Sequence, residues 1–536
     1  MQRGNADGDN VFGQCGVVGR HRAEHSGEQN CQQVFARQFA NCGCGLSRIQ
    51  SNGPWIRRIT KNETGSSNRW RGSKRSRAVG PEPVTRSRAR KRIRSGLAII
   101  AGVFVASTSW SHAQVLTAEE FVMPTSTARD VFAPSYLPVL TEPDSREDVA
   151  LEDTPVKRRF WPEYQPRGLR AGAWMFYPTL LAEAIYDSNV FASPVNAQAD
   201  AIAHVGASLS ARSLWERHGI AMEMSAGSLF YKSHSALNQT NATFASTGHY
   251  DIDHSTQVLG AFHAAYLHDQ PGSLTSPTGA VNPTPYSLIN GDVTLRKEFG
   301  RVTTAVGTGV KSYDYGSTVA QNGSIISQDS RDGQIYSAHG RADYAVSEKF
   351  ATFAALEGNW RDLRGTVSQS LSSNGYRALA GVDLEFTHLI KGELAAGYAK
   401  QHFAESTIGD VEGPSYRAML TWSPSRLIDV NFRAEQIVTQ SADTTATGIR
   451  ADAAQIGLDY EFRPNVILST AATYEKDNFQ GQPRKDNVYG VDGSVKYLMN
   501  NLISIGLRYR FTRRDSNVLQ DSFEKHQVGL NASAHF

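Results

Sequence analysis

The feature that most constrains the fold is an alternation of apolar and polar residues with a period of two, which runs from about Gly168 to Phe536. In Ile503–Phe511 every odd-numbered residue is apolar, whereas the even-numbered positions carry Ser, Gly and two Arg residues. Segments 428–435 and 527–536 alternate in the same way. Because successive side chains of a strand point to opposite faces, each strand has one apolar and one polar face. The pattern predicts an all-β fold.

Short turns and long polar loops follow one another along this region. The long loops include 235–240, 270–284, 317–332 and 366–374. Short turns at one end and long loops at the other are typical of outer-membrane barrels. Eight short turns join sixteen strands, and strands at 171–191 and 523–536 raise the expected number to about 18. We place the short turns at Glu216–Gly219, Asp253–Ser255, Phe299–Arg301, Ser347–Lys349, His388–Ile390, Ser423–Ser425, Arg463–Asn465 and Met499–Asn501.

A soluble sandwich or propeller is the alternative to a transmembrane barrel. A sandwich closes after roughly a hundred residues, whereas this alternation continues without a linker, and no blade motif repeats at a fixed period. The chain ends on Phe536, in register with the apolar face, which we interpret as a C-terminal assembly signal. Since no strand edge can stay unpaired in hydrocarbon, we expect a single closed antiparallel transmembrane β-barrel over residues 168–536.

A signal peptide is predicted at residues 86–113. A basic run begins at Arg86 and is followed by the apolar stretch Gly96–Val105 and by Ser111-His-Ala113, with small residues before the expected cleavage site. The apolar stretch is too short to anchor in a bilayer. We expect cleavage after Ala113.

The segments on either side of the signal peptide show no strand pattern. Residues 1–85 are polar and are expected to be a disordered extension. Their position before a signal peptide indicates either that translation begins nearer Val79 or Val84 or that the chain has an extended leader. Residues 114–167 are rich in Pro, Asp and Glu, which predicts a flexible periplasmic segment, with a docking segment as the alternative.

Composition excludes several classes of protein. A mean hydropathy of −0.39 argues against a helical membrane protein, whose spans each need about 20 apolar residues in a row. A formal net charge of +3 gives no argument for a nucleic-acid partner. The four cysteines, at positions 15, 31, 42 and 44, do not match the usual zinc spacings. We find no catalytic, cofactor or metal motif and expect no enzyme; one would need a Ser/His or Asp/His pair at the barrel rim.

Charged residues on the polar face of the strands are the candidate functional residues. A barrel of about 16–18 strands has room for an aqueous channel, and charges of both signs would favour polar solutes there. The alternative is a paired network that only fills the barrel. The residues that we predict to line the lumen are Arg296, Arg341, Asp343, Glu357, Arg361, Asp383, Asp429, Arg433, Glu435, Arg508 and Arg510.

The stretch Arg159-Phe-Trp-Pro-Glu-Tyr-Gln-Pro-Arg-Gly-Leu-Arg170, continuing through Tyr177-Pro178 to Tyr186-Asp-Ser-Asn-Val-Phe191, resembles the entry strand of a known family. That family comprises outer-membrane β-barrel porins often encoded beside exopolysaccharide or capsule genes. Segments 375–386, 392–398 and 421–427 agree with it. Ser188 departs from the family pattern, which would have a second acidic residue, so no cation-binding role is carried over to this corner. The resemblance implies an eighteen-stranded barrel and, for some members, an exit for secreted polysaccharide.

Two hypotheses of function follow. The first is a pore for polar solutes in the outer membrane of a Gram-negative bacterium, with secreted polysaccharide as the favoured cargo. The second is a structural or surface-binding barrel whose extracellular loops hold a ligand. The expected partners are outer-membrane lipid, the barrel-assembly machinery and periplasmic polysaccharide-export proteins; no nucleic acid is expected.

Overall fold

A computed structural model describes residues 156–159, 161–273, 275–277, 279–364, 372–386, 389–404, 409–439, 441 and 448–536. The predicted extension 1–85, the predicted signal peptide 86–113 and most of the predicted flexible segment lie outside the described residues. No helix in the described ranges is long and apolar enough to cross a membrane.

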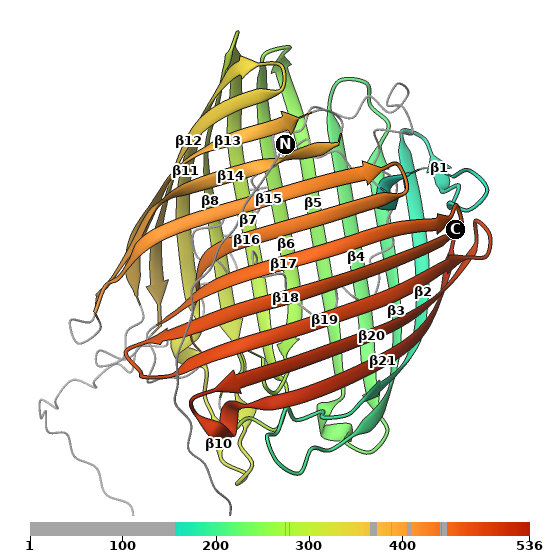
Figure 1. Ribbon diagram of the computed structural model, residues 1–536, viewed down its shortest axis with the longest axis vertical. Coiled ribbons are helices and arrows are strands. Elements are labelled where there is room, and N and C mark those ends of the chain that lie inside the picture. Colours follow the sequence, from blue (N-terminus) through green and yellow to red (C-terminus); the bar gives the residue numbers. More distant parts are fainter. Residues whose placement is uncertain are drawn as a thin grey trace, which may run out of the picture. The chain divides into compact units, whose positions relative to one another are not determined.

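Eighteen antiparallel strands form one closed barrel, as the alternation predicts (Figure 1). Each barrel strand pairs with the next along the chain, and β21 closes the barrel by pairing with β2, with Thr179 opposite His535 and Asp187 opposite Gln527. The barrel strands are β2 (Trp174–Asp187), β3 (Asp200–Ser213), β4 (Gly219–Tyr231), β5 (Gln239–Asp253), β6 (Thr256–Asp269), β7 (Thr284–Phe299), β8 (Val302–Tyr315), β11 (Gly333–Ser347), β12 (Phe350–Leu363), β13 (Ser373–Phe386), β14 (Ile390–Phe403), β15 (Val411–Ser425), β16 (Ile428–Thr439), β17 (Gly448–Arg463), β18 (Val466–Gln480), β19 (Lys485–Leu498), β20 (Ile503–Ser516) and β21 (Phe523–His535).

Minor elements lie outside the barrel wall's regular ladder. Strand β1 (Leu169–Ala171) forms a hairpin with β2, and β9 (Thr318–Val319) pairs with β10 (Ile325–Ile326) inside the loop between β8 and β11. The short 3-10 helices are η2 (Val156–Arg158), η3 (Ser235–Leu237), η4 (Asp329–Arg331) and η5 (Leu519–Asp521).

Seven of the eight predicted short turns lie where two strands connect, but the prediction at Ser423–Ser425 is wrong. These residues belong to β15, and the chain turns at Arg426 and Leu427 instead. The register shifts between Trp422 and Ser425, which marks a β-bulge. Proline has no N–H for the ladder and is tolerated in a strand at a bulge. Pro424 therefore marks a bulge here, although prolines also mark turns.

The first barrel strand is shorter than the predicted range 171–191. It ends at Asp187, whose Oδ1 accepts the backbone N–H of Asn189 at 2.9 Å. The Asn189 side chain in turn donates to the backbone oxygens of Ser193 and Glu524. These bonds satisfy the backbone of a loop, so the strand does not continue beyond Asp187.

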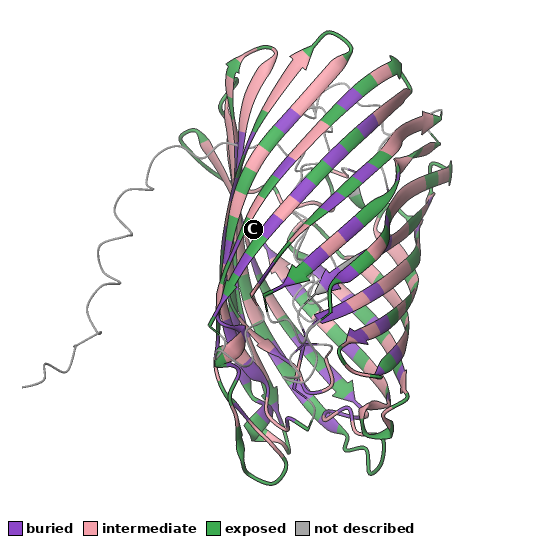
Figure 2. Ribbon diagram, turned by 90° about the vertical axis from the view of Figure 1, so that its left-hand side faces the viewer, coloured by how far each residue is buried: buried purple, intermediate pink, exposed green. Residues whose placement is uncertain are grey.

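Exposure alternates along the strands, as Figure 2 shows by colour. The exposed set is apolar: Leu530 is 57% exposed, and Phe536, in step with it, is 47% exposed. The opposite set is polar, and Glu357 and Asp429 are each only 2% exposed. A soluble protein shows the opposite arrangement, because it buries apolar side chains and exposes charged ones. The arrangement instead suits a wall with hydrocarbon on its outer side.

Candidate functional site

The candidate site is the polar face of the barrel strands, opposite the exposed apolar side chains; we call it the inner wall. Arg341 of β11 is its best-connected residue. Its guanidinium donates to Asp343 Oδ1 at 2.8 Å, to Asp383 Oδ2 at 2.6 Å and to Glu393 Oε2 at 2.6 Å. It also lies 3.7 Å above the ring of Phe353. One arginine thus links strands β11, β13 and β14 by charge-assisted hydrogen bonds.

A second group continues this network. Arg377 of β13 donates through Nε to Glu357 Oε2 at 2.6 Å. Arg417 of β15 lies 3.7 Å from Glu357 and 3.9 Å from Glu393, and so joins the two groups. We call the resulting set the charged belt; it comprises Arg341, Asp343, Glu357, Arg377, Asp383, Glu393 and Arg417.

Other predicted residues form separate pairs on the inner wall. Arg433 and Glu435 pair at 2.8 Å on β16, and Arg510 pairs with Asp492 of β19. Arg296 contacts Glu298 at 2.7 Å. Arg508 lies 3.4 Å from Glu183 of β2, across the closing strand β21.

Asp429 holds the chain segment that precedes the barrel. Its carboxylate accepts the backbone N–H of Val156 and the hydroxyl of Ser423, the latter at 2.6 Å. Beside it, Lys157 pairs with Asp459 at 2.7 Å and Arg159 pairs with Glu461 at 2.7 Å. Residues 156–159 therefore lie against the inner wall at the short-turn end of β16 and β17, and we call them the lead-in segment.

Arg361 of β12 is the exception among the predicted residues. It is 4% exposed, yet within the described part of the chain its three guanidinium nitrogens have no hydrogen-bond partner. Phe536 lies on the opposite, apolar face, in step with Val528 and Leu530.

The prediction missed several partners of these residues. Glu183, Arg377, Glu393, Arg417 and Asp492 all belong to the inner wall. The period of two already contains the signal for some of them: Arg377, for example, lies six residues before Asp383 on the same strand and hence on the same face.

A Ser/His pair is present, but it lacks an acidic third member. Ser504 Oγ lies 3.0 Å from His535 Nε2, and the other ring nitrogen lies 3.3 Å from Thr179 Oγ1. In hydrolases of this kind a carboxylate stabilises the imidazolium that forms during the reaction, which a threonine hydroxyl does not do. Within the described ranges, no group of three or more His, Cys, Asp and Glu side chains is placed to hold a metal ion.

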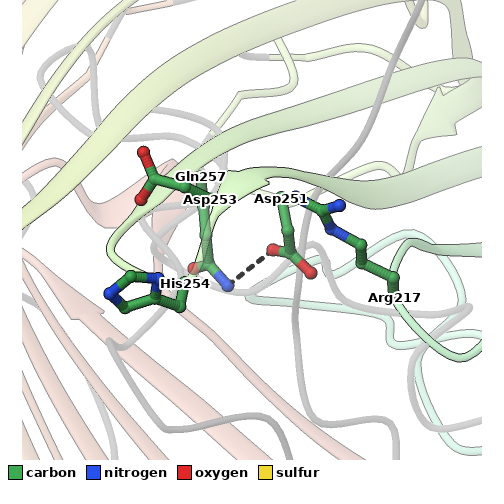
Figure 3. Close-up of a pocket in the computed structure, with 5 residues that line it drawn as sticks. All are labelled: Arg217, Asp251, Asp253, His254 and Gln257. Atoms are coloured by element: carbon green, nitrogen blue, oxygen red, sulfur yellow. Dashed lines mark hydrogen bonds between the residues drawn. The ribbon is translucent and has the colours of Figure 1, made fainter.

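A polar pocket lies near the short turn between β5 and β6 (Figure 3). Gln257 donates to Asp251 Oδ1 at 2.8 Å, and Arg217 donates to the backbone oxygen of Ile252 at 2.7 Å. Asp253 is occupied by the turn, where it accepts from Ser255 and Thr256. Of these bonds, the one between Gln257 and Asp251 joins two lining residues, and the others are made to residues at the adjacent turn.

Similar solved structures include large barrels. The siderophore receptor PiuA from Acinetobacter baumannii is 9% identical, with 69% of this chain and 82% of that chain covered and a TM-score of 0.37. Pseudomonas aeruginosa OccK5 (OpdH) is 12% identical, with 67% and 98% covered and a TM-score of 0.36. Pseudomonas aeruginosa OpdL is 11% identical, with 68% and 100% covered and a TM-score of 0.38. At these scores the likenesses carry no argument about this chain.

No curated protein matches the sequence significantly. A family model does match, over residues 161–536, which include every strand of the barrel. The chain therefore belongs to the family described as "Putative beta-barrel porin 2" and is a bacterial outer-membrane β-barrel protein.

Proposed function

We propose that the barrel forms a pore for polar solutes across the outer membrane and that its favoured cargo is a secreted polysaccharide. The observation that carries the pore proposal is the lateral pairing of the inner wall. Arg341 reaches Glu393 three strands away, and Arg417 reaches Glu357 over the same span. Such contacts run along one part of the wall, between β11 and β15, so they hold charge at the wall without bridging the barrel.

Polysaccharide as the cargo rests on chemistry and on the family resemblance. Sugar hydroxyls both donate and accept hydrogen bonds, and a wall with carboxylates beside guanidinium groups offers partners for both roles. The proposed partners are outer-membrane lipid on the apolar face, the barrel-assembly machinery, with Phe536 as its signal, and periplasmic export proteins at the short-turn end.

The lead-in segment favours a second candidate function. A segment that lies against the inner wall narrows the short-turn end, as expected of a structural or surface-binding barrel. The loops of such a barrel would bind the ligand, and the loop between β8 and β11 carries its own hairpin, β9–β10.

Single-channel conductance in a planar bilayer distinguishes the pore from the structural or surface-binding barrel. We expect the purified, folded protein to give large and steady conductance steps. A barrel that is folded, as judged by heat-modifiable migration on a gel, but does not conduct would contradict the pore proposal and favour the second candidate. Loss of secreted polymer on deletion of the gene, restored by the wild-type chain, would support polysaccharide as the cargo; unchanged secretion would exclude it.

A further inference from the structure

Arg361 is a buried cation that forms no ion pair with a carboxylate of the described residues. The residue lies near the long-loop end of β12, and its three guanidinium nitrogens are buried and have no hydrogen-bond partner among the described residues. Arginine stays protonated in proteins, so it cannot escape the cost of burial by losing its charge. No described residue satisfies these donors, and an acceptor brought by a solute would do so.

The side chains around Arg361 are already engaged with one another. Its neighbours on the two adjacent strands are Ile335, which is apolar, and Ser373. Gln401 donates to Ser373 Oγ at 2.8 Å and to Asn359 Oδ1 at 2.9 Å, while Asn359 donates back to Gln401 Oε1 at 3.0 Å. The amides of Asn359 and Gln401 thus form hydrogen bonds with each other and not with Arg361.

A second arginine and a group of tyrosines lie close by. Tyr313 is within electrostatic range of both Arg361 and Arg331. Arg331 of η4 lies 3.7 Å above the ring of Tyr315, which stacks on Tyr286 with 5.2 Å between ring centroids. Unlike Arg361, Arg331 has partners: it donates to the backbone oxygen of Thr275 and to Gln328 Oε1, both at 3.1 Å, and it lies 3.7 Å from the carboxylate of Asp269.

This surrounding strengthens any interaction with an anion. Aromatic rings and buried amides exclude water, and a charge-assisted hydrogen bond is stronger where water is excluded. A guanidinium offers two parallel N–H groups, which match the two oxygens of a carboxylate. Asp269 offsets the charge of Arg331, so the attraction for an anion comes from Arg361, which no described carboxylate pairs.

We propose that Arg361 is a binding site for the carboxylate of an acidic solute, such as an acidic saccharide, at the long-loop end of the inner wall. The proposal deepens the pore function proposed above and rests on it for the class of solute. It assigns to the barrel a preference for acidic over neutral sugars.

The test uses glucuronate as the probe and glucose as its uncharged match. Current through the wild-type pore should be blocked by glucuronate and far less by glucose. In Arg361→Gln the glucuronate concentration for half block should rise at least about tenfold, the loss expected for one charge-assisted hydrogen bond. Arg513→Gln, which removes an equal charge from an exposed side chain near the long-loop end of β20, should leave the block unchanged. Equal block of wild type and Arg361→Gln would overturn the proposal.

A second measurement separates this site from the pore function. Glucuronate should raise the melting temperature of the wild-type barrel in detergent and should not raise that of Arg361→Gln, because a ligand stabilises the state that binds it. A barrel that does not conduct but shows this shift would refute the pore and keep the site. If the barrel conducts but glucuronate changes neither its melting temperature nor its current, the binding site is refuted and the pore function is retained. If Arg361→Gln does not fold, Arg361→Lys replaces it, because lysine keeps the charge and loses the paired N–H groups. Arg361→Lys should weaken both the block of the current and the rise in melting temperature by glucuronate. If neither is weakened, the binding site is refuted.

Discussion

Arg159 and Glu461 form an ion pair of 2.7 Å although 302 residues separate them in sequence, and their side chains are only 4% and 3% exposed. The pair fixes the lead-in segment to β17 at the short-turn end of the barrel. Removing one partner of a buried pair leaves an uncompensated charge, which typically costs about 3–5 kcal/mol. The lead-in segment therefore depends on this contact more than on its exposed neighbour, Lys157.

Arg159→Ala is expected to release the lead-in segment. Cleavage after Lys157 by a lysine-specific protease, followed by mass spectrometry of the barrel fragment, should become at least about tenfold faster, because a loss of about 1.4 kcal/mol already changes the open population tenfold. As a control, the Arg513→Ala variant should be cleaved at the wild-type rate. Its partner Asp515 lies on the same strand, β20, and both are far in sequence from the lead-in segment. The charge swap Arg159→Glu with Glu461→Arg should restore part of the protection. A wild-type rate in Arg159→Ala would show that the ion pair does not hold the segment.

Arg341→Gln is expected to weaken the barrel and to make the pore more selective for cations. Asp383 and Glu393 are directly opposite each other in the ladder, and Arg341 lies between these like charges. Like charges opposite each other destabilise a sheet. Because the Asp383 side chain is 38% exposed, water screens part of the repulsion, and we expect a loss of about 2 kcal/mol in urea unfolding.

Two related variants control this prediction. Arg417→Gln should cost less, since its contacts with Glu357 and Glu393 are longer, at 3.7 and 3.9 Å. Arg341→Lys should keep the wild-type reversal potential in a KCl gradient while losing part of the stability, because it keeps the charge but not the fork of donors. An unchanged reversal potential in Arg341→Gln would mean that this part of the wall does not face the conducting path.

Sequence alone predicts the barrel and most of its short turns, but not every connection. The alternation in 503–511 predicts β20, because a period of two is a local property of the chain. The bulge at Pro424 could not be told from a turn, since both tolerate a residue without an N–H. The end of β2 at Asp187 depends on a side-chain bond to Asn189 that no period records.

The candidate site shows the same division. Period two placed Arg341 and Asp383 on the polar face, but their shared partner Glu393 depends on the register of β13 against β14. The contact of Arg159 with Glu461 depends on closure of the whole barrel and has no local signal. The unpaired state of Arg361 is likewise visible only once the bonds of its neighbours are known.

Asp187→Asn is expected to weaken the seam where the barrel closes. The Asp187 carboxylate is 1% exposed and accepts from Lys525 at 2.8 Å and from Gln527 at 2.9 Å, both on β21. The amide keeps the shape and loses the charge, so we expect a loss of about 1–3 kcal/mol, as for hydrogen bonds to charged groups. The urea midpoint of the folded barrel measures it. Lys525→Met keeps an apolar stem but leaves the buried Asp187 carboxylate without its cation, so it should cost at least as much as Asp187→Asn. A smaller cost would show that the charge of Lys525 does not stabilise the seam.

Leu356→Arg tests directly which face of the wall meets lipid. Leu356 is 58% exposed and lies near the middle of β12, whereas Trp360, on the same face and 55% exposed, lies four residues nearer the long-loop end. An arginine on the lipid face costs about 2–4 kcal/mol at the bilayer midplane and about 0–1 kcal/mol near the interface. Unfolding in liposomes should therefore show a large loss for Leu356→Arg and a small one for Trp360→Arg. In detergent micelles, which adapt to a charged side chain more readily than a bilayer, we expect the difference between the two variants to shrink. Equal losses in liposomes would contradict this placement of the membrane along β12.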